Sequence, residues 1–305
     1  MNIVNRYLTG LPDNTRGAVT LLVAAAGFSL MALLIKLTGA RLHVTQIIFI
    51  RQICIVLIMA PQLKKDFPAS VKSHQPLMHL ARICAALVAM LAGFTAVINM
   101  PLADATAIGF AKSLFVTIFA ILLLKESVGI RRWSATLIGF CGVIIMLQPG
   151  SDGFNIYGIY AAIGAVAAGL VMVIIRMMSR TDPPSTIVIY QGAGVAVAMA
   201  IPAFITWQSP TTVEWILLLC IGITGYISQV CNVYAYKFGE ASLLAPLEYT
   251  RILYATLIGF LVFGDLPGVA TMIGATIVVL ASGYTLHRER QLHRTAVKPV
   301  SKDSV

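Results

Sequence analysis

Apolar and polar positions follow one another along the chain in long blocks. Apolar runs of about 20 residues recur, which is the length that an α-helix needs to cross a bilayer, and the polar stretches between them are short. The pattern therefore predicts an all-α membrane protein with ten transmembrane helices. The predicted spans are 17–37, 44–62, 77–98, 102–124, 133–149, 157–178, 185–206, 212–236, 241–264 and 268–287.

Composition supports the same class. The chain has 305 residues, of which 58% are hydrophobic and 11% are charged, whereas a soluble domain carries roughly 25% charged residues. The five cysteines all lie inside apolar runs and form no CxxC pair, so we expect buried small apolar side chains and neither disulfides nor a metal site. No Walker A, HExxH or GxSxG sequence occurs, so we expect neither ATP hydrolysis nor a cofactor nor enzymatic activity.

The basic residues predict the orientation. The net charge is +10, but the Lys and Arg side chains are scattered singly between apolar runs, which does not favour nucleic-acid binding. With the N-terminus placed in the cytoplasm, 16 of the 22 Lys and Arg residues fall on inside segments and only Arg41 falls outside. The positive-inside rule therefore predicts a multi-pass protein of the inner membrane with both termini cytoplasmic.

The two ends of the chain are polar. Residues 1–16 precede an apolar run that continues to Leu37, longer than the core of a signal peptide, so we expect an uncleaved first span. Residues 288–305 form a basic cytoplasmic tail without apolar periodicity, for which disorder is predicted.

An internal repeat divides the chain at 17–149 and 150–287. The segment 135–139 (Ala-Thr-Leu-Ile-Gly) resembles 270–274 (Ala-Thr-Met-Ile-Gly), and 104–109 matches 240–245 more weakly. Five spans per copy is an odd number, so the second copy enters the membrane upside down. Small residues four apart, such as Ala270 and Gly274, predict close helix packing. Two inverted five-helix repeats are typical of secondary transporters.

Charged residues within spans four and nine are the strongest candidates for function, because a charge near the bilayer centre costs several kcal/mol. Lys112 is predicted near the midplane in span four, and Glu248 lies in span nine, which enters from the other side. Two interpretations remain open: the two side chains bind a substrate between them, or they form a structural salt bridge. If transport is coupled to protons, Glu248 is the candidate carrier, because a buried carboxyl group can exchange protons near neutral pH.

Further basic residues lie within spans. Arg251 follows Glu248 by one helical turn and could pair with it. Arg51 is deep in span two, whereas Arg82 and Lys36 lie near span ends and are predicted to snorkel towards the interface. Arg51, Lys112 and Arg251 against Glu248 give an excess of positive charge, which favours a substrate with a carboxylate or another anionic group.

Several other positions in spans four, eight and nine are candidates. Pro246 removes a backbone donor in span nine and predicts a kink, which either lines a cavity with freed carbonyls or serves helix packing alone. Asp104 and Glu240 begin spans four and nine, where a carboxylate favours the helix dipole. A polar face is predicted on spans eight and nine, where interhelical hydrogen bonding is the alternative to substrate binding. Its residues are Tyr226, Gln229, Asn232 and Tyr249.

These motifs resemble the EamA-type branch of the drug/metabolite transporter superfamily over nearly the whole chain. The resemblance is carried by the two five-span halves, by Leu124-Lys125-Glu126 before Arg131-Arg132, and by Ala245-Pro246 in span nine, while 101–106 (Pro-Leu-Ala-Asp-Ala-Thr) is similar to members related to animal solute carriers. Span four lacks the usual proline of this family, so it is expected to be straighter than span nine.

The resemblance implies a secondary transporter that moves a small organic metabolite by alternating access. Related proteins include amino-acid exporters and importers of riboflavin or S-adenosylmethionine, and the positive charge disfavours the last of these substrates. A multispan enzyme acting on a lipid-linked substrate is the alternative, but it would need acidic groups at a membrane face. The expected partners are a small-molecule substrate, the lipid bilayer and coupling protons, with a monomeric or homodimeric protein.

Overall fold

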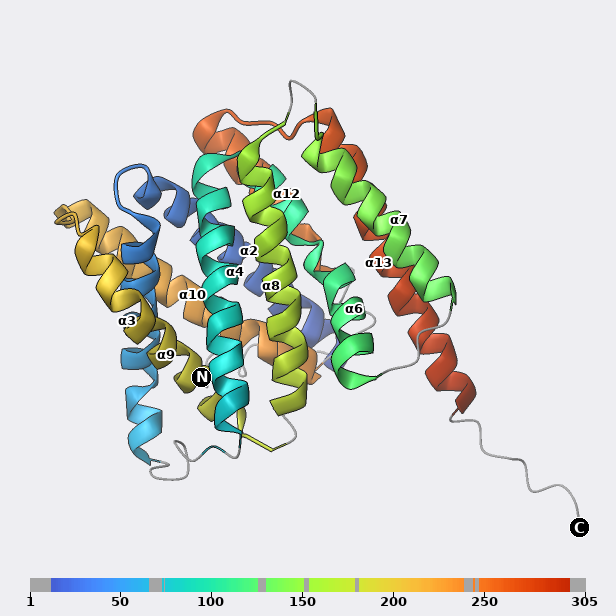
Figure 1. Cartoon of the computed structure of the whole chain (residues 1–305), viewed down its shortest axis with the longest axis horizontal. Coiled ribbons are helices and arrows are strands. Elements are labelled where there is room, and N and C mark those ends of the chain that lie inside the picture. The colour runs from blue at the N-terminus through green and yellow to red at the C-terminus, as the bar shows by residue number, and fades with distance from the viewer. Residues whose placement is uncertain are drawn as a thin grey trace, which may run out of the picture.

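The structure is a computed structural model and describes residues 12–65, 73, 75–125, 130–150, 154–178, 181–238, 244 and 247–296. Within these residues the chain forms helices and no strand, which confirms the all-α prediction (Figure 1). The helices are α2 (Asp13–Gly39), α3 (Val44–Lys65), α4 (Pro76–Asn99), α5 (Leu102–Gly109), α6 (Lys112–Leu124), α7 (Ile130–Leu147), α8 (Ile156–Met178), α9 (Pro184–Ile205), α10 (Thr212–Phe238), α12 (Thr250–Phe263) and α13 (Val269–Ala296).

The helices match the predicted spans. Seven segments of the described chain are long and apolar enough to cross a membrane, and the segment Leu102–Leu124, which contains α5 and α6, is one of them. Three shorter apolar helices, Trp133–Leu147, Thr250–Phe263 and Val269–Ala281, coincide with spans five, nine and ten. The last helix differs from the prediction, because α13 continues to Ala296 where a disordered tail was expected. This polar extension is rich in Arg, Gln, Glu and Leu, which are strong helix formers.

Span four is interrupted although it lacks a proline. Helix α5 ends at Gly109 and α6 begins at Lys112. Between them the amides of Phe110 and Ala111 bond to carbonyls three residues earlier, at 3.1 and 2.9 Å, which is the tighter 3₁₀ pattern. Span four is therefore not one regular helix. Pro246 lies outside the described residues, so the kink of span nine stays a prediction.

The packing of the helices follows an inverted repeat. The most extensive contacts pair α2 with α10, α4 with α8, α7 with α13 and α3 with α9. Each pair joins one helix of the first five spans to one of the last five. Exchanging the two halves converts the α2–α10 pair into the α8–α4 pair and leaves the α3–α9 and α7–α13 pairs unchanged. The predicted architecture of two inverted five-helix repeats is therefore confirmed.

Helices α7 and α13 lie side by side at one edge of the bundle (Figure 1), and glycines allow their close approach. A Cβ atom added at Gly274 would lie 2.4 Å from the Gly142 carbonyl oxygen and 2.4 Å from Met146 Cγ. A Cβ atom at Gly142 would lie 2.8 Å from the Gly274 carbonyl oxygen. The small residues predicted at this interface are therefore required by the packing of two backbones.

Replacement of Gly274 by leucine is expected to destabilise the protein, because the backbone of α7 cannot move aside without losing its contacts. Overpacking typically costs about 1–3 kcal/mol, so the thermal midpoint in detergent should fall by several degrees. Gly268→Leu is the matched control, since a Cβ atom there meets only Thr271 Oγ1, at 4.0 Å. An unchanged midpoint in Gly274→Leu would contradict this account of the α7–α13 interface.

Candidate functional site

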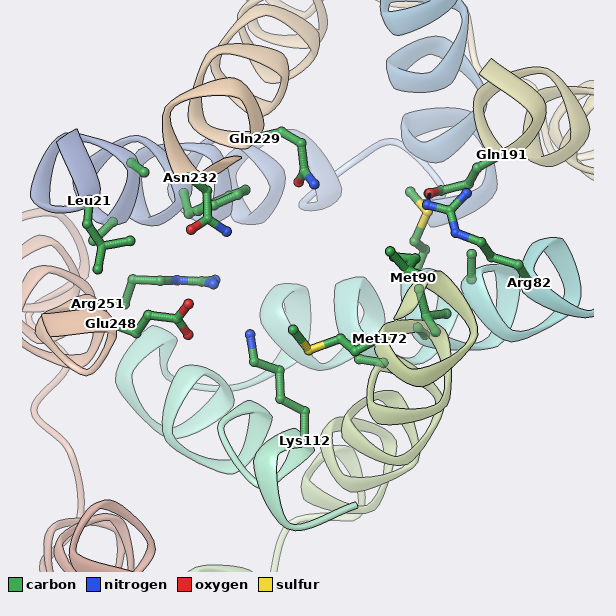
Figure 2. Close-up of a pocket in the computed structure, with 18 residues that line it drawn as sticks. Leu21, Arg82, Met90, Lys112, Met172, Gln191, Gln229, Asn232, Glu248 and Arg251 are labelled. Carbon is green, nitrogen blue, oxygen red and sulfur yellow. Dashed lines mark hydrogen bonds between the residues drawn. The ribbon is translucent and has the colours of Figure 1, made fainter. Parts of the chain in front are cut away.

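A cavity of about 300 Å³ lies between the two halves of the bundle (Figure 2). It is bounded by α2, α4, α6, α8, α9, α10 and the beginning of span nine, so both repeats contribute to it. Most of its lining is apolar, from alanines, methionines and branched side chains. The polar and charged side chains that line it are Arg82, Lys112, Gln191, Gln229, Asn232, Glu248 and Arg251.

The break in span four positions Lys112, which is the first residue of α6. Figure 2 shows its ammonium group extending into the cavity towards Glu248 and Arg251, which come from span nine on the opposite wall. The guanidinium of Arg251 lies over the ring of Phe28, with 5.0 Å from Cζ to the ring centroid, and its Nε is buried without a hydrogen-bond partner among the described residues. The predicted meeting of spans four and nine therefore occurs in the structure.

Five of the eight predicted substrate-binding residues line this cavity: Lys112, Gln229, Asn232, Glu248 and Arg251. The other three do not. Arg51 donates a hydrogen bond to Gln52 Oε1 at 2.7 Å. Tyr249 packs its ring against that of Phe110, with 5.0 Å between centroids, and Tyr226 is half-buried away from the lining.

Arg82 is a cavity residue that the sequence did not identify. It was expected to snorkel, but it is only 4% exposed and donates hydrogen bonds to the Ile187 carbonyl oxygen, at 2.6 Å, and to Gln191 Oε1. Both acceptors belong to α9, more than 100 residues away in sequence, so no local pattern reveals them. The partners of Arg82 are neutral, and its positive charge is therefore not cancelled by a carboxylate within these bonds.

The same end of the bundle holds a buried pair of hydrogen-bonded side chains. His79 Nε2 lies 2.8 Å from Asp182 Oδ2, and the two side chains are 3% and 0% exposed. Ser73 donates a second hydrogen bond to Asp182 at 2.8 Å, and the His79 ring stacks on Tyr190 at 4.3 Å between centroids. This cluster joins the start of α4 to the α8–α9 connection and so ties the two repeats together.

Asp182→Ala is expected to lower the free energy of unfolding, because it leaves the buried His79 ring and the half-buried Ser73 hydroxyl without their acceptor. Each buried unsatisfied group costs about 1–3 kcal/mol. The thermal midpoint of the purified protein measures this loss, and Asp13→Ala is a suitable control because that carboxylate is 76% exposed. Equal midpoints for the two variants would show that the His79–Asp182 pair does not stabilise the bundle.

At the opposite end of the bundle, Lys36 makes a specific ion pair and does not snorkel. Its Nζ donates to Asp265 Oδ2 at 3.1 Å and to the Met100 carbonyl oxygen at 3.0 Å, and it lies 4.5 Å from the centroid of the Phe263 ring. Asp265 thus ties the α12–α13 connection to α2. Lys36 was predicted to snorkel towards the interface, and this prediction did not include its specific partners, Asp265 and Met100.

A second ion pair stands at this same end. Arg41 hydrogen-bonds the Glu214 carboxylate through Nε, at 2.6 Å, and through a second nitrogen, and it also donates to the Ser209 carbonyl oxygen at 2.9 Å. The hydrogen bonds that Arg41 donates to Glu214 raise the pKa of Arg41 above its ordinary value, so the guanidinium stays charged. Polar contacts therefore join the two repeats at each end of the bundle.

The remaining predictions have mixed outcomes. Asp104 lies in the first turn of α5 as expected, but no side chain caps that helix, and one of its oxygens is buried without a hydrogen-bond partner among the described residues. Glu126 and Glu240 lie outside the described residues. Cys54 is buried, but Cys84 and Cys141 are exposed, so the expectation of five buried cysteines was wrong. No group of three His, Cys, Asp or Glu side chains that could hold a metal ion occurs in the described part of the chain.

A charged cavity between two inverted repeats of membrane-spanning helices defines a multi-pass membrane transporter of small molecules. Two copies of one family model, described as "EamA-like transporter family", match residues 15–148 and 155–286. The chain therefore belongs to the EamA-like transporter family.

Named relatives agree with this class. The chain is 25% identical to an S-adenosylmethionine uptake transporter of Rickettsia bellii, with coverage of 84% of this chain and 88% of the relative. It is 28% identical to a riboflavin transporter of Vibrio cholerae, covering 92% and 95%, and 29% identical to the pseudopaline exporter CntI of Pseudomonas aeruginosa, covering 87% and 94%. The chain is thus a transporter of a small metabolite, and the comparisons point away from an enzyme.

One solved structure supports the fold. A crystal structure of a protein with 19% sequence identity matches with a TM-score of 0.63, covering 92% of this chain and 99% of that chain. At this identity the likeness establishes the fold alone.

Proposed function

We propose that this protein moves a small organic metabolite bearing a carboxylate group across the inner membrane by alternating access. The observation that carries the proposal is the charge of the cavity. Three cations, Arg82, Lys112 and Arg251, line it against one carboxylate, Glu248. A charge in a low-dielectric cavity is stabilised by a nearby opposite charge, so the cavity favours a ligand with a net negative charge.

The relatives support a small organic metabolite as the substrate, and the charge of the cavity narrows its class. A riboflavin transporter and a pseudopaline exporter stand beside the S-adenosylmethionine transporters among the similar proteins. S-adenosylmethionine carries a sulfonium cation, which the excess of positive charge disfavours. An amino-acid-like or other carboxylate-bearing solute fits the lining better, with Gln229 and Asn232 supplying neutral hydrogen-bonding groups beside the charges.

Alternating access is supported by the arrangement of the polar contacts. The His79–Asp182 pair closes one end of the bundle and the Lys36–Asp265 pair closes the other, and each pair joins the two repeats. An inverted repeat gives two states of similar energy when one set of contacts breaks while the other holds. With both termini cytoplasmic, as the distribution of basic residues predicts, His79 faces the cytoplasm and Lys36 faces outward.

The alternative of a membrane enzyme acting on lipid-linked substrates is not favoured. Such an enzyme needs carboxylates or a metal at a membrane face, whereas the described part of the cavity lining holds a single carboxylate, Glu248, between the repeats. The comparisons also give transporters as the similar proteins.

Reconstitution separates these functions. The purified protein in proteoliposomes, with no other protein present, is expected to exchange a radiolabelled carboxylate metabolite across the bilayer faster than protein-free vesicles do. The panel should contain acidic, zwitterionic and cationic metabolites of similar size. Flux of cations alone, or flux of none of the panel, would contradict the proposal.

A further inference from the structure

A second cavity of about 270 Å³ adjoins the first. The two share part of their lining, including Met90, Lys112 and Arg251. The first cavity touches α2 from Leu21 to Phe28, whereas the second touches it from Met31 to Ile35, farther along the helix axis. The two cavities therefore follow one another through the bundle, with Lys112 and Arg251 at their junction.

The second cavity differs from the first in chemistry. Apart from the shared cations, Thr106 is the one polar side chain among the described residues that line it, and its hydroxyl already donates to the Leu102 carbonyl oxygen at 2.7 Å. The rest of the lining is aliphatic or aromatic, with Phe94 and Phe110 among it. The described lining of this cavity therefore offers apolar contact. Its free hydrogen-bonding groups are those of Lys112 and Arg251, at the junction with the first cavity.

Two glycines on different helices leave this cavity open. Gly93 of α4 and Gly109 of α5 both line it, and a Cβ atom added at either would meet no heavy atom within 4 Å. Gly164 behaves differently, because a Cβ atom there would lie 3.0 Å from the Gly93 backbone nitrogen. Gly164 serves helix packing, whereas Gly93 and Gly109 maintain empty space.

Arg251 marks the boundary between the two cavities. Its guanidinium lies 5.0 Å from the ring centroid of Phe28, which lines the first cavity, and 5.9 Å from that of Phe110, which lines the second. Lys112 also lies near the Phe110 ring, with 5.6 Å from Nζ to the centroid. A cation between two aromatic faces places the positive charge where a polar compartment meets an apolar one.

We propose that the second cavity is a subsite for an apolar, ring-sized group of the transported molecule, whose carboxylate binds Lys112 and Arg251. The substrate class is then an amphipathic organic anion. This rests on the proposed function, because it assumes that the cations at the junction bind the substrate. The volume is sufficient, since an apolar cavity of about 150 Å³ can bind benzene.

The test compares two dicarboxylates that differ by one ring, succinate and 2-benzylsuccinate, by isothermal titration calorimetry on the protein in lipid nanodiscs. Burial of the ring is expected to make 2-benzylsuccinate bind about tenfold tighter than succinate, or more. In Gly93→Leu the leucine side chain fills the second cavity, so the advantage of the ring should fall below about twofold while succinate affinity is unchanged.

Gly109→Leu repeats the test from α5, and Gly268→Leu, which lies outside both cavities, should behave as the unaltered protein.

The outcomes separate the two proposals. Equal affinity for the two dicarboxylates in the unaltered protein, or an advantage of the ring that survives in folded Gly93→Leu and Gly109→Leu, overturns the subsite and leaves the anion site standing. Lys112→Met should weaken both ligands alike. If neither dicarboxylate binds the unaltered protein, or if Lys112→Met binds both normally, the proposed anion site fails and the subsite fails with it. Leucine replaces glycine in a helix without loss of helix propensity, so these variants should fold.

Discussion

Replacing Lys112 by methionine is expected to reduce the initial rate of transport of a carboxylate-bearing substrate by about 100-fold. Lys112 lines both cavities and extends towards Glu248 and Arg251 across the first of them. A hydrogen bond to a charged group contributes about 1.5–3 kcal/mol, and about 2.7 kcal/mol corresponds to a factor of 100. Methionine keeps the length and apolar packing of the lysine stem, so the change removes mainly the charge. Flux into proteoliposomes measures the effect.

The controls for Lys112→Met address the interpretation of a structural salt bridge. Lys112→Arg keeps the charge and should retain substantial flux. Lys125→Met removes an exposed lysine outside the lining of both cavities and should keep the flux of the unaltered protein. Normal flux in Lys112→Met together with a lowered thermal midpoint would show that the lysine locks two helices and does not bind substrate.

Glu248→Gln is expected to abolish accumulation driven by a pH gradient. We propose Glu248 as the proton carrier because it is the one carboxylate among the described residues that line the cavity. One proton moving down a gradient of one pH unit supplies about 1.4 kcal/mol, enough for about tenfold accumulation of substrate. Glutamine keeps the shape of the side chain but cannot exchange a proton. Substrate should therefore equilibrate in the variant without accumulating.

The measurement is substrate accumulation in proteoliposomes with an imposed pH gradient of one unit, compared with counterflow at equal pH. Counterflow should persist in Glu248→Gln, because exchange of one substrate for another requires no net proton movement. Asp13→Asn is a suitable control, since its carboxylate is 76% exposed and lies outside the cavity lining. Gradient-driven accumulation by Glu248→Gln at the level of the unaltered protein would exclude Glu248 as the carrier.

Sequence patterns predicted the fold well because the bilayer imposes simple rules. Helices must satisfy their own backbone hydrogen bonds in lipid, so long apolar runs specify the spans almost one for one. The sequence also identified Lys112 and Glu248 as functional candidates, because a charged side chain in lipid is costly. Their meeting across the cavity could be expected from inverted symmetry, which brings spans four and nine together.

The tertiary contacts could not be predicted from the sequence, because they depend on partners far along the chain. Arg82 lies near the end of its span, and nothing local indicates that its guanidinium bonds to Ile187 and Gln191 of α9. The same holds for Lys36, whose position suggested snorkelling but whose partner Asp265 is 229 residues away. The break in span four arises from a 3₁₀ turn at Phe110 and Ala111, for which no proline gives a signal.

The most direct measurement of the central claim is a thermal-shift screen of small metabolites on the purified protein, paired with Lys112→Met and Arg251→Met. The account predicts that the stabilising compounds carry a carboxylate, and that their stabilisation disappears in both variants because the cations at the cavity junction bind it. Stabilisation by cationic metabolites, or carboxylate-dependent shifts of the same size in both variants, would contradict an anion site between spans four and nine.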